Sequence, residues 1–215
     1  MSNQDYLLRM IEQFAIFISR IVFKRDAGLF EEAQEELDGI MRDLLDLDPD
    51  SVFKADRQRL TALLESEEDE DRLFILGRAI EEKALVSAAS DRGRTEDDIL
   101  IEFAVRFLIK SDRAGRSRGR RRKEIEEAFG RVREVGTSAT GLEVMSYYEE
   151  LGLLDKAEDL LFELLSTPND RTVARGKTFY TSLLALDDEA LRKGNLPRDE
   201  VEEGMNHLRT LAGEG

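Results

Sequence analysis

The chain has 215 residues, of which 37% are charged and 41% hydrophobic, and its formal net charge is −15 at pH 7. This composition predicts one globular, helix-rich unit, and the negative charge argues against general affinity for DNA or anionic membranes. Because there is no cysteine, disulfides, thiolate nucleophiles and cysteine-based metal centres are excluded, and a reducing, cytoplasmic location is expected.

Apolar residues three and four apart predict a first helix at about 5–26. Its most apolar stretch, Phe14 to Phe23, is interrupted by Ser19 and Arg20, so it is too short and too charged to span a bilayer. It also lacks the basic start and small-residue cleavage site of a signal peptide. We therefore predict neither a membrane segment nor a leader.

A second helix is predicted at about 30–47, with Gly28 as the hinge before it and Pro49 marking its end. The same spacing and the Gly, Pro, Ser, Asp and Asn clusters between segments predict the remaining helices. These lie at about 52–64, 71–89, 96–110, 121–135, 142–151, 155–165, 172–193 and 198–211. No segment alternates with period two, so no sheet is expected.

One motif occurs twice: a glycine, a large apolar residue two positions on, an alanine five positions on and a leucine four after that. The copies are Gly28, Phe30, Ala33, Leu37 and Gly152, Leu154, Ala157, Leu161. The glycine lets one helix end in a left-handed turn, and the alanine lets two helices approach closely. Each copy therefore predicts a helical hairpin.

With Tyr148 four residues before Gly152, this spacing resembles the tetratricopeptide repeat, although Lys24 stands at the tyrosine position of the first copy. A third candidate hairpin surrounds Gly93. The resemblance implies an all-α fold of antiparallel hairpins, near 5–47, 71–110 and 142–166, stacked as a short right-handed solenoid. We expect one domain over 1–215, with C-terminal helices at 172–213.

Residues 5–13, the Gly28 hairpin, and residues 147–152 and 155–165 together also resemble an uncharacterised bacterial family of small helical proteins. This resemblance implies a bacterial cytoplasmic setting and carries no assigned activity.

Three features of the sequence resemble parts of catalytic or ligand-binding sites. His207 is the only histidine and has no partner at metal-ligand spacing, Gly176-Lys177-Thr178 lacks the earlier glycine of a phosphate loop, and the acidic run 65–71 lies on one connector. We interpret them as an ordinary histidine, a chance match and a solvated loop. No catalytic residue, metal site or cofactor is predicted, and an enzyme is not expected.

A cationic segment stands out in this acidic chain, because residues 110–123 carry a net charge of +7. Its candidate contact residues are Arg116, Arg118, Arg120, Arg121, Arg122 and Lys123, following Arg113. Three interpretations remain: a loop neutralised by the protein's own acidic surface, a dock for an acidic partner, or a site for RNA or another polyanion. No aromatic residue is interleaved to stack on bases.

Apolar residues cover more of the first helix than one neighbouring helix can hide, so Phe14 and Phe17 lie either among several helices or at a dimer or partner interface. Tyr147, Tyr148 and Tyr180 could line a groove, or they could be core.

These features favour a non-catalytic protein-interaction or scaffold module that binds a partner protein in a groove, with homodimerisation as one option. The alternative is RNA or polyanion binding through the Arg-rich loop 113–123.

Overall fold

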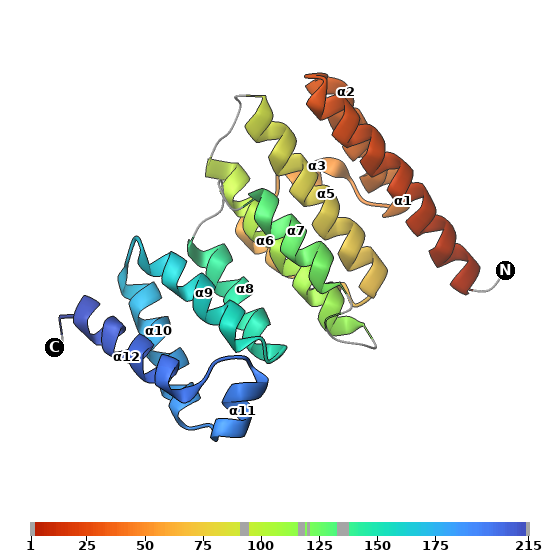
Figure 1. Ribbon diagram of the computed structural model, residues 1–215. Coiled ribbons are helices and arrows are strands. Elements are labelled where there is room, and N and C mark those ends of the chain that lie inside the picture. Colours follow the sequence, from red (N-terminus) through yellow and green to blue (C-terminus); the bar gives the residue numbers. More distant parts are fainter. Residues whose placement is uncertain (1–2, 91–94, 116–118, 120, 133–137, 214–215) are drawn as a thin grey trace. The chain divides into compact units, whose positions relative to one another are not determined.

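The computed structural model describes residues 3–90, 95–115, 119, 121–132 and 138–213 (Figure 1). Every regular element among these residues is a helix, which confirms the all-α prediction. Contacts divide the chain into two compact units, Met1–Thr137 and Ser138–Gly215, and each is described by itself. The single domain predicted over 1–215 stays a prediction.

Unit 1 begins with a long helix and its hairpin partner, continues through two short helices, and ends with three more. These are α1 (Asn3–Asp26), α2 (Phe30–Gly39), α3 (Pro49–Phe53), α4 (Arg57–Ser66), α5 (Glu70–Ala89), α6 (Thr95–Ala114) and α7 (Arg122–Val132), with a π-helical turn at Ile40–Leu44. The predicted helix at 52–64 is two helices, because the Asp56 carboxylate caps a new start by accepting the Arg59 N–H at 2.9 Å. Pro49 begins α3 as well as ending the preceding segment.

The core of unit 1 is centred on α5, which packs against α1, α2 and α6. Residues are buried around most of its circumference, as expected of a helix enclosed by others: Leu73, Ile75, Leu76, Gly77, Ala79, Ile80, Glu81, Glu82, Ala84 and Val86. Gly77 brings α5 and α6 close, because a Cβ there would lie 2.8 Å from Leu108 Cγ. The helices of the hairpin predicted at 71–110 therefore pack together, while its turn near Gly93 lies outside the described residues.

Two buried carboxylates tie helices of unit 1 together. Arg25 of α1 donates to Glu82 of α5 at 2.5 Å, and Arg57 of α4 donates to both oxygens of Glu102 of α6 at 2.5 and 2.8 Å. A buried carboxylate without a partner would cost several kcal/mol, roughly 3–5 when one partner is removed. These pairs therefore help to fix which helices are neighbours.

Unit 2 consists of two helix pairs and one short helix. Its helices are α8 (Ser138–Glu150), α9 (Leu154–Leu165), α10 (Asp170–Leu184), α11 (Asp188–Lys193) and α12 (Arg198–Leu211). Helix α8 pairs with α9 and α10 pairs with α12, and α10 also contacts both α8 and α9. The helix predicted at 172–193 is interrupted, because the Asp187 side chain accepts the Ala190 N–H at 2.8 Å and starts α11.

The repeated glycine motif forms the same turn in both units. Gly28 and Gly152 have φ of 75° and 71°. In each turn the residue after the glycine donates its N–H five positions back, Leu29 to Lys24 O at 2.8 Å and Leu153 to Tyr148 O at 2.9 Å. This is the Schellman arrangement that satisfies the last carbonyls of a helix. The two turns join α1 to α2 and α8 to α9, and each pair of helices packs together.

Candidate functional site

An open cleft of about 390 Å³ lies in unit 2 between α8 and α10. The two helices are the first members of the two hairpins, and they present a mixture of apolar, hydroxyl and charged side chains. The lining residues are Leu142, Glu143, Ser146, Arg171, Ala174, Arg175 and Thr178. Positions 142 and 146, and likewise 171, 175 and 178, share a helix face because they lie three or four residues apart.

The polar centre of the cleft is Arg175. Its guanidinium forms an ion pair with Glu149 and donates to Ser146 Oγ at 3.4 Å. Burial raises the pKa of Glu149 above its ordinary value, and the nearby Arg175 charge opposes that rise. Arg171 lies one helical turn earlier and is exposed. The cleft therefore offers Arg171, the Glu149-paired Arg175, one carboxylate (Glu143) and two hydroxyls beside the apolar surfaces of Leu142 and Ala174.

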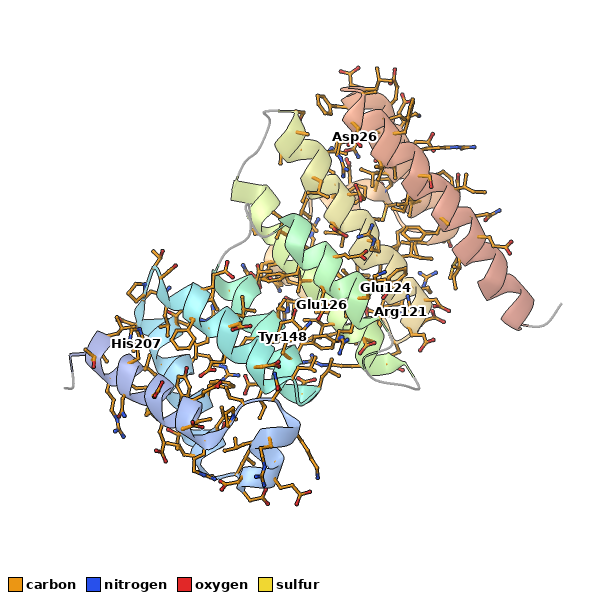
Figure 2. All side chains as sticks on the ribbon, viewed as in Figure 1. Asp26, Arg121, Glu124, Glu126, Tyr148 and His207 are labelled. Carbon is orange, nitrogen blue, oxygen red and sulfur yellow. The ribbon has the colours of Figure 1, made fainter. Side chains whose placement is uncertain are left out.

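The tyrosines proposed for a groove do not line this cleft. Tyr180 is 1% exposed, and its hydroxyl donates to Glu158 Oε1 at 2.9 Å. Tyr147 and Tyr148 are buried with their rings 6.2 Å apart, and Lys156 lies over the Tyr148 ring (Figure 2). Helical spacing had left both a groove and the core open for these tyrosines, and their burial places them in the core. The cleft residues were missed, because only tertiary packing brings α8 beside α10.

The predicted interface residues of α1 lie largely within unit 1. Phe14 is 5% exposed and makes an edge contact with Phe74, with ring centroids 6.1 Å apart. Phe17 is half-buried beside Gly39, where a Cβ would lie 3.2 Å from the Phe17 ring. Among the side chains of α1 that the structure describes, from Met10 onward, the exposed large apolar ones are instead Phe23, at 71%, together with Ile16 and Ile11.

The described part of the Arg-rich segment is held by unit 1. Arg121 forms an ion pair with Asp71 and lies over the Phe74 ring at 4.1 Å (Figure 2). The buried Asp112 carboxylate accepts the backbone N–H groups of Gly119 at 2.6 Å and Arg121 at 2.8 Å. Arg121 therefore has a structural role at the start of α7.

The other cationic candidates differ from Arg121. Arg122 and Lys123 are 45% and 86% exposed, with ion pairs of 3.7 and 3.8 Å to residues one turn along α7. Such exposed pairs contribute little. Arg116, Arg118 and Arg120 lie outside the described residues.

The three features that resemble parts of catalytic or ligand-binding sites have local explanations. His207 is exposed beside Phe162, with ring centroids 5.8 Å apart (Figure 2). Gly176 lies inside α10 against Leu208 and Leu161, where no phosphate loop can form. In the acidic run, the Asp69 carboxylate caps the start of α5 by accepting hydrogen bonds from the backbone N–H groups of Asp71 and Arg72.

Burial works to raise the pKa of Glu67, but hydrogen bonds from Arg72 and from backbone N–H groups hold it below its ordinary value. No group of three or more His, Cys, Asp or Glu positioned for a metal ion occurs in the described part of the chain. Within that same part, no helix has the length and hydropathy needed to cross a membrane.

A family model describes nearly the whole chain, residues 1–213. The chain belongs to a family of unknown function (DUF6483). No curated protein and no solved structure matches it. Membership in DUF6483 confirms the expected resemblance to an uncharacterised family, and it assigns no activity to the cleft or to the cationic segment.

Proposed function

We propose that this protein is a non-catalytic interaction module of tetratricopeptide-like architecture, and that it binds a segment of a partner protein in the cleft between α8 and α10. The observation that carries the proposal is the position of the cleft on the first helices of two helix pairs, α8 with α9 and α10 with α12. In stacked helical hairpins, successive units create a continuous surface on which a peptide can lie. The repeated Schellman turn also supports this architecture.

Charge indicates what kind of segment would bind. Unit 2 is acidic overall, yet Arg171 and Arg175 lie together on the cleft face of α10. A partner segment with an acidic side chain next to an apolar one would match these arginines and the surfaces of Leu142 and Ala174. The two hydroxyls, Ser146 and Thr178, would accept or donate hydrogen bonds to its backbone.

Two threonines of α10 allow a matched test. Thr178 lines the cleft, whereas Thr181 is exposed on the same helix and does not line it. Tagged full-length protein would be used to capture partners from nuclease-treated native lysate, with mass spectrometry as the readout. Thr178→Trp should fill the cleft and lose the partner, and Thr181→Trp should retain it. Equal capture by both variants would contradict the cleft as the binding site.

Polyanion binding through residues 113–123 is the second candidate, and the exposure of Arg122 and Lys123 supports it. Its test must leave Arg121 intact, because Arg121 supports the start of α7. The double variant Arg122→Ala/Lys123→Ala should weaken RNA binding and reduce its dependence on salt. Capture of a protein partner that survives nuclease treatment and is lost in Thr178→Trp, but not in the Arg122→Ala/Lys123→Ala variant, would favour the cleft.

A further inference from the structure

The two equivalent Schellman turns differ in what covers them. Positions 124 residues apart correspond, so Phe30 and Glu31 after the first glycine match Leu154 and Asp155 after the second. The backbone at Leu29 and Leu153 is nearly identical, with φ/ψ of −88°/65° and −90°/68°. Since the local structure is the same, a difference in exposure must come from other parts of each unit.

In unit 2 the turn is covered by the connection between α11 and α12. Gly194 lies directly on Leu154, where a Cβ would overlap the leucine side chain. The Asp155 N–H donates to Gly194 O at 3.1 Å, and Asn195 Nδ2 donates to the Asp155 carboxylate at 2.9 Å. Leu154 is consequently only 8% exposed.

The covering segment is itself the end of a short helix. Asn195 has φ of 55°, and Leu196 donates its N–H to Leu191 O at 3.1 Å. The segment is therefore another Schellman turn, the second in unit 2. Gly194 lets the backbone lie close to Leu154, its carbonyl accepts a hydrogen bond from the Asp155 N–H, and the Asn195 side chain donates one to the Asp155 carboxylate. These three properties define what the turn after Gly152 binds.

In unit 1 the corresponding place is a pocket of about 220 Å³. It is lined by Phe30, Glu31 and Gln34 of α2, by Lys83, Val86 and Ser87 of α5, and by Ser90, which follows α5. Phe30 is half-buried, and its neighbour Leu29 is 43% exposed. Among the residues that the structure describes, those matching Leu154 and Asp155 therefore border an opening, and none of the described segments covers them as the turn at Gly194 does in unit 2.

The equivalence extends to the floor of the pocket. Gln34 corresponds to Glu158, and each accepts a hydrogen bond from the next long helix, Gln34 from Lys83 at 2.6 Å and Glu158 from Tyr180 at 2.9 Å. Gly204 of α12 lies against Tyr180, so unit 2 supplies a cover there as well. Helix α2, like α9, has no side-chain cap for its first N–H groups.

We propose that the pocket beside Phe30 docks the glycine-containing C-terminal turn of a helix from a partner protein. The partner's glycine would lie on Phe30 as Gly194 lies on Leu154, and its carbonyl would accept the Glu31 N–H. An amide or ammonium group after the glycine would pair with the Glu31 carboxylate. This site lies in unit 1 and does not depend on the cleft between α8 and α10.

The covering segment of unit 2 supplies the probe. A synthetic peptide of residues 187–198 can be held helical by a lactam joining Glu189 and Lys193, whose side chains already form an i,i+4 ion pair at 2.8 Å. It would be titrated into the ¹⁵N-labelled full-length protein. Amide shifts should appear at Phe30, Glu31 and in the adjoining part of α5.

Two controls make the test specific. A peptide with Gly194→Val and a protein with Phe30→Ala should each bind at least about tenfold more weakly, as loss of a central contact does in an interface. Phe162→Ala, at an exposed phenylalanine of unit 2, should bind normally. Absence of shifts in unit 1, or shifts confined to the turn after Gly152, would overturn the proposal.

Discussion

The buried pair of Tyr180 and Glu158 provides the sharpest test of how unit 2 is held together. Tyr180 is 1% exposed and Glu158 is 8% exposed, and the hydroxyl donates to the carboxylate at 2.9 Å. A hydrogen bond to a charged group contributes about 1.5–3 kcal/mol, and a buried acceptor that loses its donor keeps its desolvation cost. Tyr180→Phe should therefore destabilise unit 2 by about 2–3 kcal/mol at neutral pH.

The dependence of this loss on pH has a defined sign. Burial, with the carboxylates of Glu200 and Asp159 nearby, raises the pKa of Glu158 above its ordinary value near 4.5, and the Tyr180 hydrogen bond opposes the rise. Because the folded state holds the proton more tightly, Glu158 contributes stability below that ordinary value and loses it as pH rises through the folded pKa. Glu158→Gln should remove this loss and be more stable than the wild type at neutral pH.

Urea denaturation followed by circular dichroism, at neutral pH and below the ordinary carboxyl pKa, measures both effects. The penalty of Tyr180→Phe should shrink in acid, where the hydroxyl meets a protonated carboxyl and the bond is a neutral one worth about 0.5–1.5 kcal/mol. In the Glu158→Gln background, the same tyrosine substitution should show no such change across this range. An equal penalty for Tyr180→Phe at both pH values would refute the assignment of a charged, buried acceptor.

Three further substitutions, two of them with a comparison variant, test individual packing claims, each by the free energy of unfolding in urea. Gly152→Ala should cost roughly 1–2 kcal/mol from backbone strain alone, since no atom lies near its Cβ position, whereas Gly130→Ala, at an exposed position inside α7, should stabilise by about 0.5–1 kcal/mol. Gly204→Ala should cost about 1–3 kcal/mol, because its Cβ would overlap the Tyr180 ring. Arg121→Ala should destabilise unit 1 by about 2 kcal/mol through loss of the ring contact and ion pair, against no more than about 0.5 for Lys123→Ala. Equal losses in the last pair would contradict a structural role for Arg121.

The sequence predicted those features that depend on local rules. Periodicity located the long helices, and glycine's access to positive φ identified the turns at Gly28 and Gly152. Two helix breaks were missed, because the caps at Asp56 and Asp187 lie within stretches whose apolar spacing continues. The available signal was the aspartate itself, because aspartate is a preferred residue at the position just before a helix begins.

The candidate site was less predictable, since it depends on which helices become neighbours. Helical spacing cannot show how many helices surround Tyr180, so a core residue resembled a groove residue. The cationic run likewise gave no sign that Arg121 would stack on Phe74, a residue 47 positions earlier that only tertiary packing brings near. The sequence also did not indicate that Arg171 and Arg175 line a cleft, because the cleft forms only where α10 packs beside α8.

The repeated motif explains why similar local sequence does not give similar surfaces in the two units. The turn after Gly152 is closed by Gly194 and Gly204, two residues more than forty positions downstream, at which a methyl group would overlap Leu154 or Tyr180. The turn after Gly152 is therefore buried within unit 2 because these two glycines let the backbone lie directly against the side chains of Leu154 and Tyr180. At the turn after Gly28 the equivalent residues border a pocket, with a lysine in place of the tyrosine. The same motif thus forms an internal packing contact in unit 2 and a candidate binding site in unit 1. The residues that cause this difference in exposure lie outside the motif.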